Sequence, residues 1–406
     1  MPADDKMTID ERRKYLHQMQ KRYRGADRQT REQLLDEMEH VAELHRKSLI
    51  RLMAGDLERK PRTQQRGRTY GPRVARAVQV IAESLDYPCA ERLTPNLVWM
   101  ANHLAAQGEL QVTPAVLAQL GEMSLSTVHR LSADWQRDIP RRLPRGGPER
   151  ANQVLREVLM KRMAWDESQP GHFEVDLVHH GGPSATGDYV HTLQMIDVCT
   201  GWSERRAVLG RSYVVLQDAF RWLSCRLPFP VLEIHPDNGS EFFNHHLLRF
   251  WKDRVQGVVL SRSRPYQKND NRFVEQKNAT LVRAYLGYDR LDTVAHTLAL
   301  NRLYHQMWVY YNLFQPVMHQ IEKTFLTLED GSTRIQRRHD RARTPFERLC
   351  ETNAISPQRR AEIEALRNRT NPRQLRHEIY EALRRLFDMP NAIPGQPQNV
   401  YDTLRF

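Results

Sequence analysis

The sequence predicts an α/β protein in which an all-helical amino-terminal part precedes a mixed five-stranded sheet with helices on its faces. Before about residue 138, apolar residues recur at the spacing of amphipathic helices. After Trp165 the pattern changes to the period-two alternation of strands, and from 212 onwards strand and helix patterns alternate. Strands that come first as a meander and then cross over through helices form a mixed sheet.

Length and charge indicate several domains and a polyanionic partner. The chain has 406 residues, whereas single hydrophobic cores stop growing at roughly 250 residues. Lys and Arg together number 61 against 49 Asp and Glu, which gives a formal net charge of +12. This excess favours nucleic acid over an acidic small molecule as the partner.

The sequence also predicts a cytoplasmic protein without membrane contact. No run approaches the roughly 20 apolar residues that cross a bilayer. The start, MPADDKMTIDERRKY, has neither the basic nor the apolar region of a signal peptide. The four cysteines form no CxxC pair, which argues against a disulfide framework and against a Cys-based zinc module.

Residues 1–58 predict a helix-turn-helix DNA-binding domain. Helical periodicity runs from about 8 to 53 and breaks near Glu43 and Leu44. The helix after the break carries Arg46, Lys47 and Arg51 on its outer side, where they suit phosphates and base edges in a major groove. A plain helical hairpin without DNA contacts is the open alternative.

A basic linker at 59–73 follows this domain. It contains no acidic residue, and its Arg66 and Arg68 suit contacts along phosphates or in a minor groove. A solvated linker without contacts is the competing interpretation.

A second helix-turn-helix domain is predicted at 74–138. Gly121 marks its turn, and the helix that follows offers Thr127 and Arg130 as groove contacts, with Leu125 and Val128 turned inward. The linker at 139–168 begins with a stretch rich in Pro, Gly and Arg, which indicates a domain boundary.

The predicted sheet lies within 169–300. Strands are expected at 171–180, 189–202, 203–210, 231–238 and 257–264, and helices at 212–227, 241–254 and 270–286. The predicted element order is therefore βββαβαβα.

Three carboxylates in this region are candidates for a metal site. Asp176 lies in the middle of the first strand, Asp237 at the carboxyl end of the fourth, and Glu275 in the first turns of the last helix. A carboxylate on an otherwise apolar strand is costly unless it is paired, and a metal supplies the partner. Carboxylates that converge on one crevice suit Mg²⁺ or Mn²⁺, which take further ligands from water and substrate phosphates.

These residues resemble the DDE triad of the retroviral-integrase-type catalytic core found in many insertion-sequence transposases. The segments FEVDLV, HPDNGSEF and RPYQKNDNRFVEQKN carry the resemblance, with 60 residues between the two aspartates and 37 between Asp237 and Glu275. It covers about 171–286. It implies a ribonuclease-H-like core with Asp176, Asp237 and Glu275 as catalytic residues that bind two Mg²⁺ or Mn²⁺ ions. The implied reaction is phosphoryl transfer that cleaves element ends and joins 3′ hydroxyls to target DNA.

Other polar residues of the core are weaker candidates or accessory ones. Glu174 shares the face of Asp176 but has no motif to support it, and Asp197 fits a strand end. His235 is a candidate for contact with a phosphate, or for support of the metal ligand Asp237 beside it. The basic residues around the glutamate are expected to hold the DNA backbone; they are Arg264, Lys268, Arg272 and Lys277.

Residues 301–406 predict a β-hairpin and a helical region. The hairpin turns across 329–332, and its basic strand and loop include Arg334, Arg337 and Arg338, a plausible further DNA contact. Helical periodicity runs from 357 to 389. The Pro-containing tail that follows is expected to be either disordered or docked on another subunit.

The sequence therefore predicts a DDE-type transposase, an endonuclease and polynucleotidyl transferase that acts on double-stranded DNA as a homo-oligomer. Two alternatives stay open: a metal-dependent nuclease of the same fold without strand transfer, and a DNA-binding regulator with a residual core. Two predicted helix-turn-helix units argue against the nuclease, and three intact carboxylates argue against the regulator. The sequence has no P-loop, so any use of ATP requires a helper ATPase.

Overall fold

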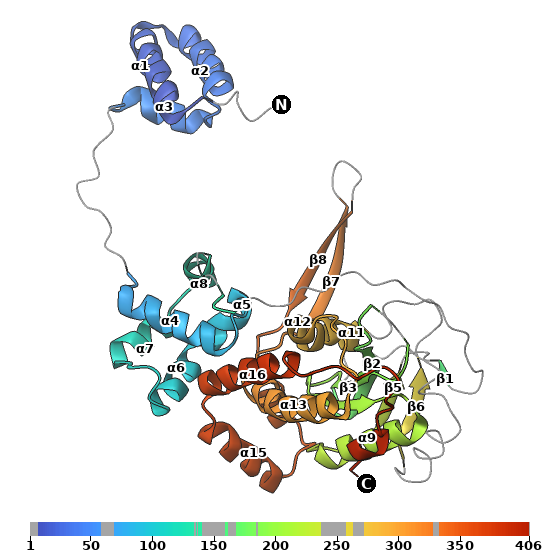
Figure 1. The fold of residues 1–406 in the computed structure, drawn as a ribbon. Coiled ribbons are helices and arrows are strands. Elements are labelled where there is room, and N and C mark those ends of the chain that lie inside the picture. Colours follow the sequence, from blue (N-terminus) through green and yellow to red (C-terminus); the bar gives the residue numbers. More distant parts are fainter. Residues whose placement is uncertain are drawn as a thin grey trace. The chain divides into compact units, whose positions relative to one another are not determined.

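The computed structural model describes residues 7–57, 69–133, 135, 137–139, 159–160, 168–183, 186–236, 257–262, 272–327 and 333–405. The chain divides into two compact units, Met1–Thr69 and Tyr70–Phe406 (Figure 1). In the described parts of the chain, no helix has both the length and the apolar character needed to cross a membrane.

The first unit contains three helices, α1 (Ile9–Gly25), α2 (Arg28–Ala42) and α3 (Arg46–Ala54). A capping box between Thr8 and Glu11 begins α1, and each supplies an acceptor for the other's backbone N–H. The side chain of Gln20 donates to the carbonyls at the end of α3. These contacts satisfy helix ends around a small apolar core that includes Met38 and Leu49.

The second unit begins with a helical region: α4 (Pro72–Ser84), α5 (Ala90–Leu93), the 3₁₀ helix η2 (Thr94–Asn96), α6 (Leu97–Ala106), α7 (Pro114–Gly121) and α8 (Leu125–Ser132). The sequence assigned 74–138 to a domain of its own. In the structure its buried side chains belong to the same hydrophobic core as the sheet. The hydroxyl of Tyr310 also donates to the carbonyl of Ser84 at 2.8 Å. This region therefore packs as part of the larger unit.

Asp86 joins three parts of this unit. It is 1% exposed, and its carboxylate accepts hydrogen bonds from Arg376, Tyr380 and Tyr285. The guanidinium Nη1 of Arg137 lies 3.3 Å from the same carboxylate. One buried carboxylate thereby connects the end of α4 with the helices near residues 285 and 380, and the cations and hydroxyls around it compensate its charge.

The sheet has six strands in the order β1-β6-β5-β2-β3-β4. Strands β2 (His172–His179), β3 (Val190–Asp197) and β4 (Ser203–Leu209) form an antiparallel meander. Strands β5 (Glu233–Pro236) and β6 (Val259–Arg262) run parallel to β2. All five predicted strands are present with shifted ends, and the short β1 (Leu159–Met160) was not predicted. The helix expected at 241–254 lies outside the described residues.

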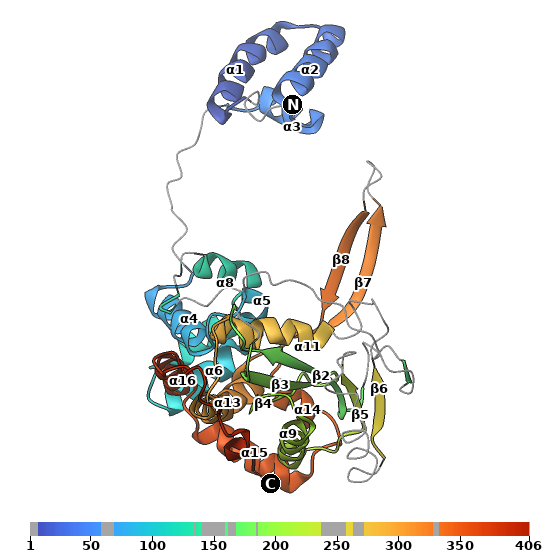
Figure 2. The same cartoon turned by 45° about the vertical axis from the view of Figure 1, so that its right-hand side comes forward.

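Helices lie on both sides of the meander. Figures 1 and 2 show α11 (Arg272–Lys277) above β2 and β3, with α9 (Tyr213–Arg226) and α13 (Val294–Phe314) below. The chain of α11 continues as the π-helix η3 (Asn278–Arg283) and then as α12 (Ala284–Leu286). On α13, the amides of Asn301 and Asn312 bond the backbone N–H and C=O of Ala207 and Ser203 in β4. These bonds satisfy backbone groups that the edge strand would otherwise leave open.

The remaining elements are β7 (Gln320–Thr327), β8 (Thr333–His339), α14 (Pro345–Cys350), α15 (Pro357–Arg369), α16 (Pro372–Phe387) and the 3₁₀ helix η4 (Val400–Thr403). Strands β7 and β8 form an antiparallel hairpin that projects from the unit (Figure 2). The tail docks on its own unit, because Asp292 accepts from the N–H of Ala392 and Asp218 from that of Arg405. The described part of the tail is therefore ordered on its own unit, whereas docking on another subunit stays a prediction.

Candidate active site

Asp176 lies on β2, on the face that α11 covers. Its side chain is half-buried. One carboxylate oxygen accepts from the backbone N–H of Leu177 at 2.8 Å, and the other accepts from the amide of Asn278 in η3. The register pairs Asp176 with Gln194 of β3, so the carboxylate lies beside a second polar side chain on the same face.

Glu275 lies on α11, and its side chain is exposed. The residue before it, Val274, is fully buried and donates its backbone N–H to Glu174 of β2 at 2.9 Å. Asn278, which bonds Asp176, comes three residues after Glu275, and residues three apart lie on neighbouring parts of a helix surface. Contacts on both sides of Glu275 therefore hold its helix against the strand of Asp176.

Asp237 lies outside the described residues. The strand before it, β5, ends at Pro236, which is paired in register with Val175. The last described residue before the second aspartate is therefore a neighbour of the residue before Asp176. Within the described parts of the chain, no three His, Cys, Asp or Glu side chains are close enough together to hold a metal ion.

Glu174 and Asp197, the two other acidic candidates, are both buried in the fold. Glu174 is 1% exposed. Asp197 is fully buried and accepts from the backbone N–H of Gly171 and from both the N–H and the hydroxyl of Thr200. Burial raises the pKa of Asp197 to about 6, against the lowering effect of these hydrogen bonds. Asp197 therefore secures the turn after β3.

His235, a candidate phosphate contact from the sequence, is buried. Its Nδ1 lies 2.7 Å from the hydroxyl of Ser261, which in turn donates to Glu233. The Nδ1 of His172 lies 3.0 Å from a carboxylate oxygen of the same glutamate. This chain of hydrogen bonds links β2, β5 and β6 beneath the site, and it leaves His235 with a structural role among the described residues.

The predicted DNA contacts of the helical regions fall into two groups. Lys47 and Arg51 are exposed and lie one turn apart on α3, whereas Arg46 is paired with Asp36. On α8, Thr127 and Arg130 lie on the outer surface, where the guanidinium of Arg130 donates to the hydroxyl of Thr127 at 3.4 Å. Leu125, which was expected to face inward, is 44% exposed, because it begins α8 directly after its capping Ser124.

The remaining predicted contacts lie mostly outside the described part of the chain. Arg66, Arg68, Arg264 and Lys268 are outside it, and only the backbone of Arg272, the first residue of α11, is described.

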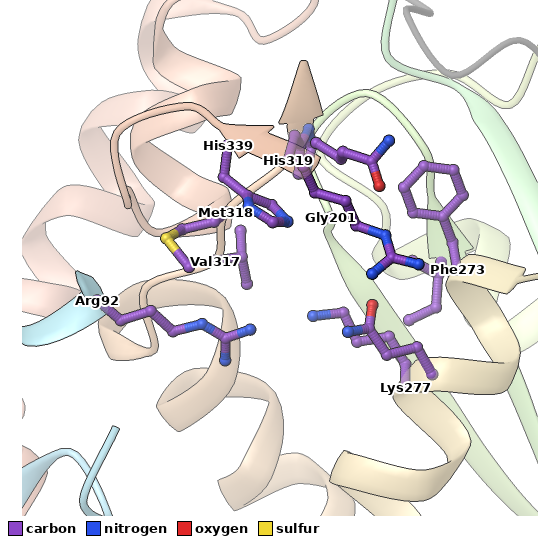
Figure 3. Close-up of a pocket in the computed structure, with 12 residues that line it drawn as sticks. Arg92, Gly201, Phe273, Lys277, Val317, Met318, His319 and His339 are labelled. Atoms are coloured by element: carbon purple, nitrogen blue, oxygen red, sulfur yellow. The ribbon is translucent and has the colours of Figure 1, made fainter. Parts of the chain in front are cut away.

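Lys277 is described in full, and it lines a cavity of about 370 Å³ next to α11. Figure 3 shows its side chain and that of Arg92 pointing into the same space, with His339 nearby. The ammonium lies 5.1 Å from the ring centre of Tyr311. Burial lowers the pKa of Lys277 to about 7, with further contributions from Arg92 and Arg348.

Sequence reasoning missed Asn278 and Arg92. The position of Asn278, one helical turn after Glu275, was a usable signal because that spacing puts both side chains on one side of the helix. Nothing in the local sequence distinguishes Arg92 from other basic residues, because the cavity is formed by segments far apart in the chain.

Comparison with protein-family models gives no match. A relative in Sinorhizobium fredii, "Uncharacterized protein y4rM", is 35% identical over 308 residues, which are 75% of this chain and 86% of the relative. The chain belongs to the y4rM family. Its similarity to y4rM extends beyond the part of the sequence that resembles the DDE core, because the matched stretch is longer than 171–286.

Among solved structures, the y4rM-family chain shows similarity to the catalytic core domain of BIV integrase. The two are 19% identical, and the match covers 36% of this chain and 85% of that one with a TM-score of 0.26.

Proposed function

We propose that the chain is a DNA transposase that cleaves element ends and joins their 3′ hydroxyls to target DNA by two-metal phosphoryl transfer. Asp176, Asp237 and Glu275 are its proposed catalytic residues. The observation that carries the proposal is the hydrogen bond from Asn278 to Asp176, because it brings the helix of Glu275 against the strand of Asp176. The proposal for Asp237 rests on the sequence motif.

The donor chemistry of the described residues fits a hard divalent cation. Asp176 is half-buried and Glu275 is exposed, so both carboxylates are accessible from solvent. Carboxylate oxygens are ligands that Mg²⁺ and Mn²⁺ prefer. Bound ions would supply charge stabilisation at the attacking and leaving oxygens.

The protein's own part in this reaction is positioning. The amide of Asn278 and the N–H of Leu177 orient the Asp176 carboxylate. Glu174 fixes the first turn of α11 and so limits where Glu275 lies. Reactions that need little covalent chemistry from the protein depend on this kind of placement.

DNA is the proposed substrate and partner. The exposed basic residues of α3, Lys47 and Arg51, and the outer surface of α8 with Thr127 and Arg130 are the proposed contacts to element ends. Joining two ends requires two active sites, so we propose a homo-oligomer assembled on double-stranded DNA. A helper ATPase is an open part of this proposal.

The experiment that tests the function compares the purified full chain with Asp176→Asn and Asp237→Ala in Mg²⁺ or Mn²⁺. The substrates are a labelled duplex with the element's ends and a supercoiled target plasmid. Asp188→Ala is the matched control, because Asp188 is an exposed acid on the same part of the chain outside the proposed triad.

Metal-dependent joined product that is lost in both triad variants and kept in Asp188→Ala supports the transposase. Cleavage without joining favours the nuclease. Tight DNA binding without any metal-dependent product favours the regulator, and either of these results contradicts the proposal.

A further inference from the structure

The cavity beside α11 lies where three segments distant in sequence meet. Arg92 comes from α5, Lys277 from α11 and Arg337 from β8 at the base of the hairpin. Figure 3 shows Arg92 and Lys277 entering from different sides, with His319 and His339 at the hairpin side. The space of about 370 Å³ therefore depends on the tertiary structure rather than on one local motif.

All charged residues that line this cavity are basic. None of its described lining residues is an Asp or a Glu, whereas Arg92, Lys277 and Arg337 are all basic. Within the described parts of the chain, no salt bridge involves these three side chains. The Nε of Arg92 is buried and has no hydrogen-bond partner among the described residues. A buried donor without a partner is costly unless a ligand or water satisfies it.

This chemistry suits a phosphate group. Guanidinium and ammonium groups that converge without a neighbouring carboxylate bind phosphate oxygens through charge-assisted hydrogen bonds. Phe273 and Val317 add apolar wall to the cavity, which suits the sugar next to a phosphate. An isolated metal ion is not a suitable occupant, because the positive charges of Arg92, Lys277 and Arg337 repel a cation.

We propose that this cavity binds a backbone phosphate of the DNA on which the chain acts. The inference rests on the proposed function, because α11 carries both Glu275 and Lys277 and forms one wall of the cavity. The hairpin strand β8 supplies Arg337 to the cavity. A free phosphate compound shares the chemistry, but only a polymer can contact Glu275 and the cavity at the same time.

The test compares two neighbouring arginines of β8. Arg337 lines the cavity, whereas Arg338 lies on the other face of the strand, where it pairs with Glu322 at 3.3 Å. Both side chains are exposed, so Arg337→Gln and Arg338→Gln each remove one charge from an exposed position on the same strand. Binding of the full chain to a labelled duplex is measured without divalent metal over a range of KCl concentrations.

The expected result is a weaker affinity for Arg337→Gln, with a slope of log affinity against log salt that falls in magnitude by about 1, the value for one lost phosphate contact. Arg338→Gln is expected to keep the wild-type slope. Arg92→Gln repeats the test from the opposite wall and should give the same change as Arg337→Gln. Thermal unfolding of each variant checks that the fold is kept.

Equal changes in slope for Arg337→Gln and Arg338→Gln would overturn the proposal, because the effect would then belong to the general charge of the hairpin. An unchanged slope in both would also overturn it. A second arm adds inorganic phosphate and measures thermal stabilisation. If phosphate stabilises the wild type but not Arg337→Gln, while the DNA slopes agree, the site takes a free phosphate compound instead of DNA.

These failures are distinguishable from failure of the proposed function. If the chain joins DNA ends in a triad-dependent manner but the salt slopes of the two variants agree, only the phosphate site is wrong. If the wild type neither binds DNA nor gives metal-dependent product, the function itself is wrong.

Discussion

Glu174 of β2 accepts a hydrogen bond of 2.9 Å from the backbone N–H of Val274 in the first turn of α11. The carboxylate is buried and lies two residues before Asp176, while Val274 immediately precedes Glu275. This bond ties together the two elements that carry the described carboxylates of the proposed triad. Glu174 therefore has a structural role. The first N–H groups of a helix have no partner within the helix, and Glu174 supplies an acceptor for one of them.

Replacement of Glu174 should therefore act mainly on stability. We expect Glu174→Ala to lower the free energy of unfolding by about 2 kcal/mol, since it leaves the buried N–H of Val274 without its acceptor. Glu174→Gln keeps an amide oxygen and should lose less. Urea denaturation followed by tryptophan fluorescence measures both, and every tryptophan lies in the second unit. If Glu174→Ala kept the stability of wild type but lost all metal-dependent cleavage, Glu174 would instead be a metal ligand.

Asn278 should act on the metal through Asp176. We expect Asn278→Ala to raise the Mg²⁺ concentration for half-maximal cleavage by about 10-fold, a typical loss when the partner of a metal ligand is removed. DNA affinity measured without metal should stay the same. Thr280→Ala, a change on the exposed side of the same π-helix, is the control. Equal metal dependence for wild type and Asn278→Ala would show that the hydrogen bond has no positioning role.

Asp86 should be essential for the packing of the second unit. We expect Asp86→Asn to cost about 3 kcal/mol or more, because it leaves the buried guanidinium of Arg376 with an incomplete set of partners. Asp388→Asn, at an exposed position just after α16, should have little effect. The free energy of unfolding of both variants is compared by urea denaturation. A loss below 1 kcal/mol for Asp86→Asn would contradict this role.

His191 should make the protein less stable in acid. It is 2% exposed, and burial, with His179 and Arg211 nearby, lowers the pKa of His191 to about 3. The unfolded chain takes up a proton near pH 6.5 that the folded chain does not, so this contribution to stability is present above pH 6.5 and lost as the pH falls towards 3. Between pH 7 and pH 5 the loss amounts to about 2 kcal/mol.

The measurement compares wild type with His191→Phe, which keeps a ring beside Tyr189 but does not titrate. As the pH is lowered from 7 to 5, the free energy of unfolding of wild type should fall by about 2 kcal/mol more than that of His191→Phe. Because the change with pH is compared, a constant loss of stability in the variant does not affect the result. Parallel curves would show that His191 does not account for acid sensitivity.

Much of the sheet could be predicted because its signals are local. The alternation of side chains in FEVDLVH predicted β2, since successive residues of a strand point to opposite faces and only one face can take polar groups. The exposed His179 and the buried His180 follow the same rule. The caps of α7 and α8 are local in the same way, because the side chains of Thr113 and Ser124 accept from backbone N–H groups three residues later.

Long-range contacts could not be predicted in the same way. The bonds from Tyr380 and Arg376 to Asp86 span 294 and 290 residues, and no pattern in the sequence connects these positions. The same limit explains why 74–138 was expected to be separate. Its helices have the composition of an independent domain, but their apolar faces pack against residues far along the chain.

The sequence by itself determined five strands of the sheet, most helices, the basic character of the chain and the choice of the three proposed catalytic carboxylates, because each depends on residue type and short spacing. Only the tertiary structure decided that Asn278 orients Asp176, that Glu174 fastens α11, and that Arg92, Lys277 and Arg337 surround one cavity. These relationships depend on which elements pack together, and packing is chosen by the whole set of buried surfaces rather than by any one segment.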